Sequence, residues 1–235
     1  VNGVWQDQWY DTKKSGGKFI RTEAQFRNFI GFNSEFTPDS GRYHLYVSLA
    51  CPWAHRTLIY RSLKDLDDHI SYSVVNPYML ENGWTFEETF PGTTSDHLFS
   101  QQYLYQIYLK ANPTYSGRVT VPVLWDKKNQ TIVSNESSEI IRMFNFSFNK
   151  LTDNNLDFYP EKFKKKIDEI NDFTYHNINN GVYKVGFATK QSVYKEELNK
   201  LFTALDQIEE MLKQNSYLLG DEILECDLRL FPTLL

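Results

Sequence analysis

Cys51 lies in the sequence context of a reactive thiol. It stands between a strand-like run, Tyr43–Val47, and a helix-like run, Thr57–Leu63. A thiol at a helix N-terminus meets unpaired backbone N–H groups and the positive end of the helix dipole. Both interactions favour the thiolate, which is the nucleophilic form of cysteine. We therefore predict that Cys51 carries out thiol chemistry, although a lone cysteine is often only a small buried core residue.

The residues that follow restrict this chemistry to a single thiol. Pro52 suits the first turn of a helix, where no backbone donor is required. Ala54 occupies the position of the second cysteine in a Cys-x-x-Cys pair. A disulfide formed by Cys51 must therefore be resolved by a thiol from outside the chain.

The composition excludes several classes of function. The net charge of −5 argues against a nucleic-acid-binding protein. No apolar run approaches the ~18 residues of a membrane span, and no signal peptide is evident. The cysteines Cys51 and Cys226 make no disulfide framework, and the five histidines show no metal-ligand spacing. We expect a cytoplasmic globular protein with no metal site, no nucleic-acid partner and no membrane partner.

Residues 43–149 have the pattern of an α/β domain. A second strand, Ile70–Val75, follows the Cys51 helix, and this order predicts a parallel βαβ unit. A long excursion, residues 76–117, holds one amphipathic helix at about Leu98–Leu109, and excursions of this size are often functional. The order β-α-β-α-β-β-α is completed by the strand runs Val119–Trp125 and Thr131–Val133 and the helical run Ile140–Phe144. Pro122 cannot donate to a sheet, so it marks a strand start, an edge or a special turn.

The segments that flank this domain have other patterns. Residues 1–42 are rich in Gly, Asn, Asp and aromatics without periodicity, which is typical of an extended arm that packs aromatics on the body. Residues 150–160 are polar and turn-rich, as in a linker. Residues 161–235 have helical periodicity and predict an all-helical domain. Its two apolar stripes are Phe163, Ile167, Ile170 and Thr174, and Leu198, Leu201, Phe202, Leu205, Ile208 and Leu212. The run Leu228–Leu235 opens a helix without a terminator, so we expect this domain to be incomplete at its C-terminal end.

Five blocks of the sequence resemble the xi-class glutathione transferases, the glutathionyl-hydroquinone reductases, which are related to the omega class. A lone Cys-Pro-x-Ala string would be weakly specific, but five blocks in collinear order over essentially the whole chain are very specific. The blocks are Cys51–Thr57, Glu81–Phe86, Gly117–Asp126, Asn135–Arg142 and Asn179–Lys184. The resemblance implies the glutathione transferase architecture, a thioredoxin-like domain with a mixed sheet followed by an all-α domain.

The resemblance also implies a glutathione site in the thioredoxin-like domain. Pro122 would follow a cis peptide bond, and the backbone of Val121 would pair with the cysteinyl part of glutathione like an added strand. Glu136 and Ser137 would hold the γ-glutamyl end with a carboxylate and the N–H groups of a helix N-terminus. The remaining contacts of the family match Trp84, Arg118, Val119 and Thr120.

These positions also have plain structural interpretations. On the residues alone, Ser137 could be only part of a helix cap, Trp84 a core aromatic and Arg118 one half of a surface ion pair. Tyr183 lies in a Gly-Val-Tyr turn, where a tyrosine is ordinarily a packing residue. In the family, the matching tyrosine faces the catalytic cysteine and donates the proton to the departing quinol.

The implied reaction uses glutathione as a cosubstrate. The Cys51 thiolate attacks the sulfur of a glutathionyl-hydroquinone, and a second glutathione resolves the mixed disulfide and releases oxidised glutathione. The family further implies a homodimer. Two alternatives are an omega-like thiol transferase that reduces dehydroascorbate and a non-catalytic module with the same fold. Retention of Cys51 and of the glutathione-binding residues speaks against the second alternative.

One block departs from the family pattern of Thr-Glu-Ala-Asp at a helix start. This chain has Leu224, Glu225, Cys226 and Asp227 there. Leucine cannot accept the capping hydrogen bond, a loss of about 1 kcal/mol. We expect this change to affect folding rather than chemistry, and Cys226 to be a buried, inert thiol.

Overall fold

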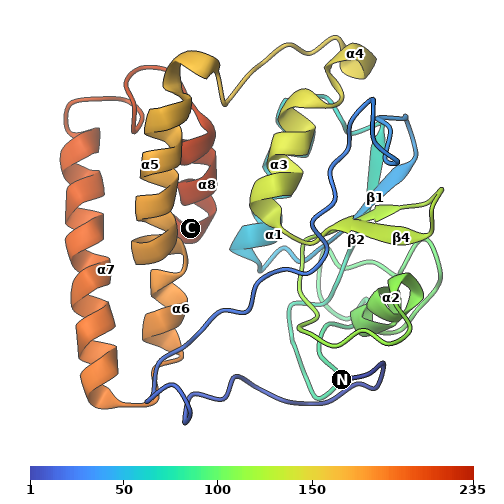
Figure 1. Cartoon of the computed structure of the whole chain (residues 1–235), viewed down its shortest axis with the longest axis horizontal. Coiled ribbons are helices and arrows are strands. Elements are labelled where there is room, and N and C mark those ends of the chain that lie inside the picture. Colours follow the sequence, from blue (N-terminus) through green and yellow to red (C-terminus); the bar gives the residue numbers. More distant parts are fainter. The chain divides into compact units, whose positions relative to one another are not determined.

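The computed structural model describes residues 1–235, which form two compact units (Figure 1). The sheet unit contains residues 1–7 and 23–156, and the helical unit contains residues 8–22 and 157–235. The first 42 residues hold no helix and no regular strand, and they are shared between both units. The domain boundaries at residues 42, 149 and 160 stay predictions.

The sheet unit has the predicted element order and a mixed four-stranded sheet. Its elements are β1 Tyr43–Val47, α1 Pro52–Leu63, β2 Ile70–Val74, α2 Leu104–Ala111, β3 Val123–Asp126, β4 Thr131–Ser134, α3 Ser137–Phe146 and α4 Asn149–Thr152. The strand order is β2-β1-β3-β4. Strand β1 pairs parallel with β2 and antiparallel with β3, which pairs antiparallel with β4. The thioredoxin-like topology is therefore confirmed.

Strand β1 forms the centre of this unit because both of its faces are covered. All five of its residues are buried, including His44, whose ring nitrogens bond to the hydroxyls of Ser71 and Ser73. Helices α1 and α3 contact each other on one side of the sheet, and α2 lies on the other side (Figure 1). A strand buried on both faces reads as a near-continuous apolar run, a pattern that β1 shows at every position except His44.

The predicted start of α2 at Leu98 is wrong, because the helix begins at Leu104. The Asp96 carboxylate accepts hydrogen bonds from the backbone N–H groups of Leu98, Phe99 and Gln101. Ser100 has a left-handed φ of 51°. These residues therefore form a compact turn around Asp96 instead of the first turn of the helix.

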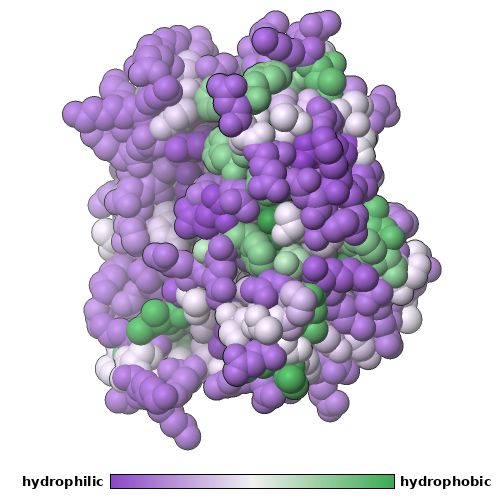
Figure 2. Space-filling model, turned by 45° about the vertical axis from the view of Figure 1, so that its right-hand side comes forward, coloured by the Kyte–Doolittle hydropathy of each residue, from purple (hydrophilic) through white to green (hydrophobic).

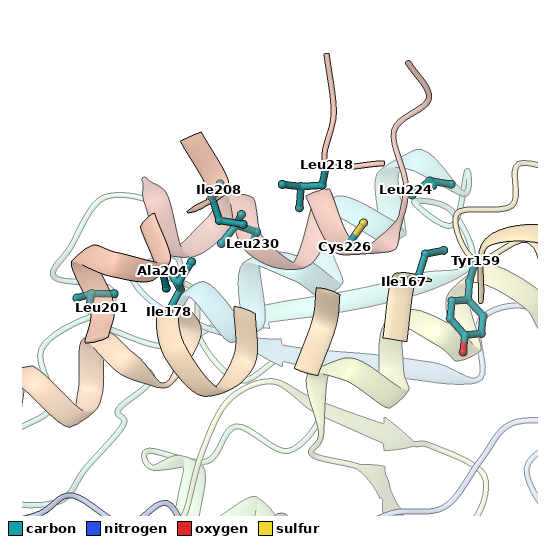
Figure 3. Close-up of a cluster of buried hydrophobic side chains, with 10 residues drawn as sticks. All are labelled: Tyr159, Ile167, Ile178, Leu201, Ala204, Ile208, Leu218, Leu224, Cys226 and Leu230. Carbon is teal, nitrogen blue, oxygen red and sulfur yellow. The ribbon is translucent and has the colours of Figure 1, made fainter. Parts of the chain in front are cut away.

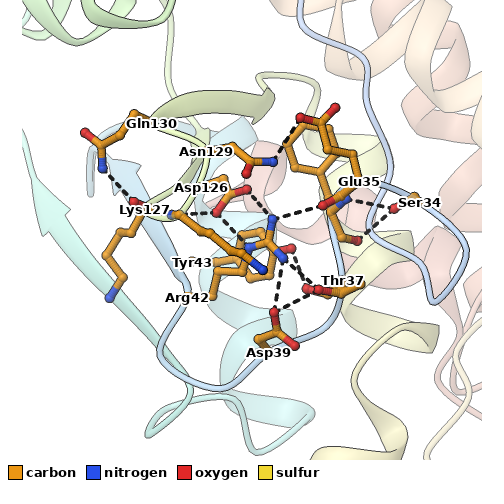
Figure 4. Close-up of polar contacts among 12 residues, drawn as sticks. Ser34, Glu35, Thr37, Asp39, Arg42, Tyr43, Asp126, Lys127, Asn129 and Gln130 are labelled. Atoms are coloured by element: carbon orange, nitrogen blue, oxygen red, sulfur yellow. Dashed lines mark hydrogen bonds and ion pairs between the residues drawn. The ribbon is translucent and has the colours of Figure 1, made fainter.

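A buried ion pair fastens residues 34–39 to the sheet (Figure 4). The Arg42 guanidinium donates to both carboxylate oxygens of Asp126, at 2.8 and 2.6 Å. It also donates to the Thr37 hydroxyl and to the Glu35 carbonyl oxygen. Asp126 ends β3, and its side chain is fully buried.

The helical unit is built on helices without any regular strand, as predicted. Its elements are η1 Glu161–Phe163, α5 Lys164–Thr174, the π-helical turn η2 Tyr175–Asn179, α6 Gly181–Gly186, α7 Gln191–Leu212 and α8 Glu225–Leu234. Its core joins buried side chains of α5, η2, α7 and α8 (Figure 3). The predicted stripe on α7 is partly wrong, because Phe202 and Leu212 are 57% and 42% exposed. The buried face of α7 instead runs through Val193, Glu197, Leu201, Ala204 and Ile208.

Helix α8 shows the consequence of the Leu224 departure. Leu224 provides no capping acceptor, but the Asp227 carboxylate still accepts from the backbone N–H of Leu224 at 2.9 Å. Its second oxygen accepts from the N–H of Leu218 at 2.8 Å. Cys226 is fully buried, in agreement with the prediction of an inert thiol. One half of the usual cap is thus retained.

The surface shows no sign of a membrane-spanning element. None of the helices, including the 22-residue α7, combines the length and apolar character that a membrane span requires. The face of the molecule in Figure 2 is mostly hydrophilic, with hydrophobic residues in separate patches.

Candidate active site

Cys51 occupies the predicted place between β1 and α1. It is the N-cap residue of α1, with extended backbone angles (φ −103°, ψ 114°), and Pro52 is the first helical residue. Its side chain is half-buried and forms no disulfide. The thiol therefore lies at the positive end of a 12-residue helix, where the thiolate is favoured.

The loop before β3 lies against this thiol. The Val121–Pro122 peptide bond is cis, as the resemblance implied. The Cys51 Sγ lies 3.6 Å from the Val121 carbonyl oxygen, to which it donates. The Val121 backbone N–H makes no hydrogen bond within the protein. A backbone donor beside a reactive thiol is a suitable partner for an extended peptide.

The N-terminus of α3 supplies a carboxylate and one free helix N–H group, that of Ser137. Glu136 is the N-cap residue, and its Oε1 accepts from both the backbone N–H and the hydroxyl of Ser138, at 3.0 and 2.8 Å. Its Oε2 makes no hydrogen bond within the protein and can accept from an ammonium group. Ser137, the first residue of α3, is 3% exposed. This arrangement can hold an amino-acid group by both of its charges.

Arg56 joins the two helix N-termini and was not singled out from the sequence. Its side chain is 1% exposed, and Nη1 donates to the Ser137 Oγ at 3.4 Å. Its guanidinium also lies over the Trp53 ring, 4.6 Å from the ring centroid. The apolar pattern of α1 concealed it, because Leu58 and Ile59 are only half-buried while Arg56 and Thr57 are buried.

The other predicted glutathione contacts lie on two loops of the sheet unit. Trp84 is half-buried in the excursion, and its carbonyl oxygen accepts from the backbone N–H of Leu104 at 2.9 Å. Arg118, Val119 and Thr120 are half-buried in the loop that leads to the cis bond. The structure therefore brings Val121 to Cys51 directly and places Ser137 against Arg56 of the Cys51 helix.

Tyr183 lies in the helical unit, on α6. The Phe19 and Phe187 rings are its neighbours, with centroids at 6.1 and 5.9 Å. The Arg21 guanidinium lies 4.5 Å from the centroid of the Tyr183 ring and donates to Asn180 Oδ1 at 2.8 Å. Residues 8–22 thus cover α6 with aromatic and cationic side chains.

The structure contains no group of three or more His, Cys, Asp or Glu side chains that could hold a metal ion. The residues around Cys51 are a thiol, backbone amides, a carboxylate and a guanidinium. Such a set suits thiol exchange with a charged peptide ligand.

Comparisons with known proteins agree with this geometry. Residues 50–145 match the family model described as "Glutathione S-transferase, N-terminal domain". The glutathionyl-hydroquinone reductase YqjG of Escherichia coli is 56% identical over all of this chain and 74% of its own length. The glutathionyl-hydroquinone reductase PcpF of Sphingobium chlorophenolicum is 52% identical with the same coverage. A relative from Schizosaccharomyces pombe, glutathione S-transferase omega-like 2, is 46% identical over 95% of this chain and 74% of its own length.

Solved structures place the fold in the same family. The xi glutathione transferase of Phanerochaete chrysosporium superposes with a TM-score of 0.90 at 54% identity, over 92% of this chain and 74% of that one. The glutathione-bound structure of YqjG also has a TM-score of 0.90, at 52% identity, over 100% of this chain and 73% of that one. This chain therefore belongs to the xi class of the glutathione transferases, the class of the glutathionyl-hydroquinone reductases.

Proposed function

We propose that this enzyme reduces glutathionyl-hydroquinones to hydroquinones with glutathione as the reductant. The observation that carries the proposal is the 56% identity, over the whole chain, to a glutathionyl-hydroquinone reductase. The position of Cys51 at the N-terminus of α1, in contact with Val121, supplies the chemistry.

The first step transfers the glutathionyl group to Cys51. The Cys51 thiolate attacks the glutathione sulfur, and an S–S bond forms while the bond between that sulfur and the aromatic carbon breaks. The aromatic carbon takes the electron pair of the broken bond and receives a proton from the Tyr183 hydroxyl. Hydroquinone leaves, and Cys51 remains as a mixed disulfide with glutathione.

The second step restores the thiol. The thiolate of a second glutathione attacks the glutathione sulfur of the mixed disulfide, and Cys51 leaves as a thiolate. One glutathionyl-hydroquinone and one glutathione are thus converted into hydroquinone and oxidised glutathione. Ala54 lies where an internal resolving cysteine would stand, so the mixed disulfide at Cys51 is resolved by an external thiol.

Glutathione is held, in this proposal, by the three segments around Cys51. The backbone of Val121 pairs with its cysteinyl part, and the N–H group of Ser137 at the start of α3 receives its γ-glutamyl carboxylate. The Glu136 Oε2 accepts from its ammonium group. The remaining contacts come from Trp84, Arg118, Val119 and Thr120.

We also infer a cytoplasmic homodimer. The reaction consumes reduced glutathione, which a reducing compartment maintains. Both cysteines of the chain are free thiols, which suits that compartment. Light scattering of the purified protein measures the oligomeric state directly, and a monomer at working concentration would contradict the dimer.

The proposal is tested by one comparative assay. Glutathione-dependent turnover of a glutathionyl-naphthohydroquinone is measured against turnover of dehydroascorbate at the same enzyme concentration. We expect the first substrate to have the higher kcat/KM by at least about tenfold, because the Tyr183 hydroxyl supplies the proton that its aromatic leaving group requires. A preference for dehydroascorbate would favour the omega-like activity, and the absence of both activities would favour a non-catalytic module.

Replacing Tyr183 with phenylalanine separates its proposed role from a packing role. Removal of a general acid lowers rates by about 100-fold or more, and we expect this loss with the glutathionyl-hydroquinone. Exchange with a small glutathionyl mixed disulfide has a thiolate leaving group, so we expect it to change less than about twofold. Tyr194→Phe, on the exposed side of α7, is the matched control. Equal loss of both reactions in Tyr183→Phe would contradict the assignment.

A further inference from the structure

The hydroxyl of Tyr108 lies in the interior of the sheet unit, and its donor and acceptor positions all have partners. Tyr108 lies on α2 and is 0% exposed. Its hydroxyl donates to the Thr120 carbonyl oxygen at 2.9 Å. The same oxygen accepts from the Thr120 backbone N–H at 3.2 Å and from Asn135 Nδ2 at 3.1 Å. A phenol offers one donor and two acceptor positions, so all three are occupied.

These bonds join the two segments that surround the Cys51 helix N-terminus. Thr120 directly precedes Val121, whose carbonyl oxygen contacts the Cys51 Sγ. Asn135 directly precedes Glu136, the N-cap residue of α3. One hydroxyl therefore holds the loop of the cis bond and the start of α3 at a set separation, although the two segments are 15 residues apart in the chain.

Tyr108 also controls which backbone groups of the loop are available. Because the N–H and the C=O of Thr120 both bond to the Tyr108 hydroxyl, they face the protein interior. In an extended segment the N–H and C=O of one residue point to one side, and those of the next residue point to the opposite side. The backbone of Val121 is thereby directed to the other side, where its N–H makes no hydrogen bond within the protein.

The other end of the connection is fixed as well. The Asn135 Oδ1 accepts from the Phe26 backbone N–H at 3.2 Å, and the Asn135 N–H donates to the Phe26 carbonyl oxygen at 3.2 Å. Both ends of the Asn135 amide side chain are therefore engaged, one by the arm and one by Tyr108. The Tyr108 hydroxyl is therefore bonded to a side chain that the Phe26 backbone holds in place.

Packing alone does not require this hydroxyl. The Tyr108 ring packs against the rings of Phe26 and Tyr115, with centroids at 6.0 and 5.0 Å, and phenylalanine would make the same contacts. A buried hydroxyl without hydrogen-bond partners destabilises a protein. The Tyr108 hydroxyl has partners, and they belong to segments of the candidate site. Burial also raises the pKa of Tyr108, so the hydroxyl stays protonated and keeps its donor.

We propose that Tyr108 is a positioning residue for glutathione, which sets the Val121 backbone and the N-terminus of α3 at the spacing that the tripeptide spans. The proposal rests on the proposed function and adds a residue that does not touch the ligand. Its effect should fall on glutathione affinity rather than on the chemical step, since the residue acts on the segments that bind glutathione.

The test compares Tyr108→Phe with Tyr43→Phe. Each change removes one buried phenol hydroxyl from the sheet unit, but the Tyr43 hydroxyl donates to the Thr37 carbonyl oxygen, beside Arg42 and away from the candidate site. The Kd of reduced glutathione is measured by calorimetry, together with the thermal midpoint, kcat and the KM for glutathione. We expect Tyr108→Phe to raise Kd and KM by about tenfold, which corresponds to about 1.4 kcal/mol, and to change kcat less than about threefold. Tyr43→Phe should lower the thermal midpoint and leave Kd within about twofold.

A rescue variant separates positioning from stability. Tyr108→4-aminophenylalanine retains a polar group at the position of the hydroxyl and should return Kd towards the parent value. If the parent binds glutathione and Tyr108→Phe binds it equally well, or Tyr43→Phe weakens it as much, this inference is overturned alone. If the parent itself binds no glutathione, the proposed function fails and the inference fails with it.

Discussion

Replacing Cys51 with alanine is expected to lower glutathione-dependent reduction of a glutathionyl-hydroquinone by about a thousandfold or more. Loss of the nucleophile removes the covalent intermediate, and the rest of an active site supplies only residual catalysis. No other residue can take over, because the one remaining thiol, Cys226, is fully buried in the helical unit. The measurement is kcat/KM at saturating glutathione. Glutathione binding should persist, since the Val121 backbone and the α3 N-terminus are unchanged.

Cys226→Ala is the matched control for this prediction. Burial and, as a smaller cause, the nearby Asp227 carboxylate raise the pKa of the Cys226 thiol to about 12, so the thiol stays protonated at neutral pH. The parent should therefore show one thiol that reacts rapidly with iodoacetamide at pH 7, and Cys51→Ala should show none. Turnover by Cys51→Ala, or its loss in Cys226→Ala, would contradict the assignment of Cys51.

The element order of the sheet unit could be predicted because each element carries a local signal. Strand β1 is a buried apolar run, α1 opens with Cys51-Pro52, and β4 is followed by helix-start residues that end in Glu136 at the N-cap. Local signals also explain the errors. The turn around Asp96 resembles a first helical turn in sequence, and Phe202 continues the periodicity of α7 although it faces solvent.

The contacts that assemble the candidate site could not be predicted in the same way. The Cys51–Val121 contact joins residues 70 positions apart and depends on the pairing of β1 with β3. Arg56 is a charged side chain that is nevertheless buried, and Tyr108 carries a buried hydroxyl. A periodic pattern of apolar residues reveals neither role. The resemblance to the xi class supplied the candidate glutathione residues. Arg56 and Tyr108, which support those residues, were found only from the structure.

Replacing Asp126 with asparagine is expected to lower the free energy of unfolding of the sheet unit by about 3–5 kcal/mol. The substitution keeps the size of the side chain but leaves the Arg42 guanidinium, whose side chain is 4% exposed, as an uncompensated buried charge. The remaining partners, the exposed carboxylate of Asp39 and neutral oxygens of Thr37 and Glu35, cannot replace a fully buried carboxylate. Urea-induced unfolding followed by far-ultraviolet circular dichroism measures the loss.

Asp67→Asn provides the control, because it breaks a second arginine–carboxylate pair of the same unit whose carboxylate is 53% exposed. Water solvates this carboxylate whether or not the pair forms, and Arg61 keeps the carbonyl oxygens of Ile70 and Asp67 as acceptors, so we expect a smaller loss, of about 1 kcal/mol. Replacing both members of the buried pair, Arg42→Met with Asp126→Leu, should cost much less than Asp126→Asn alone, since no unpaired charge remains. If the double replacement is as damaging as the single one, packing rather than charge pairing holds residues 34–39 against the sheet.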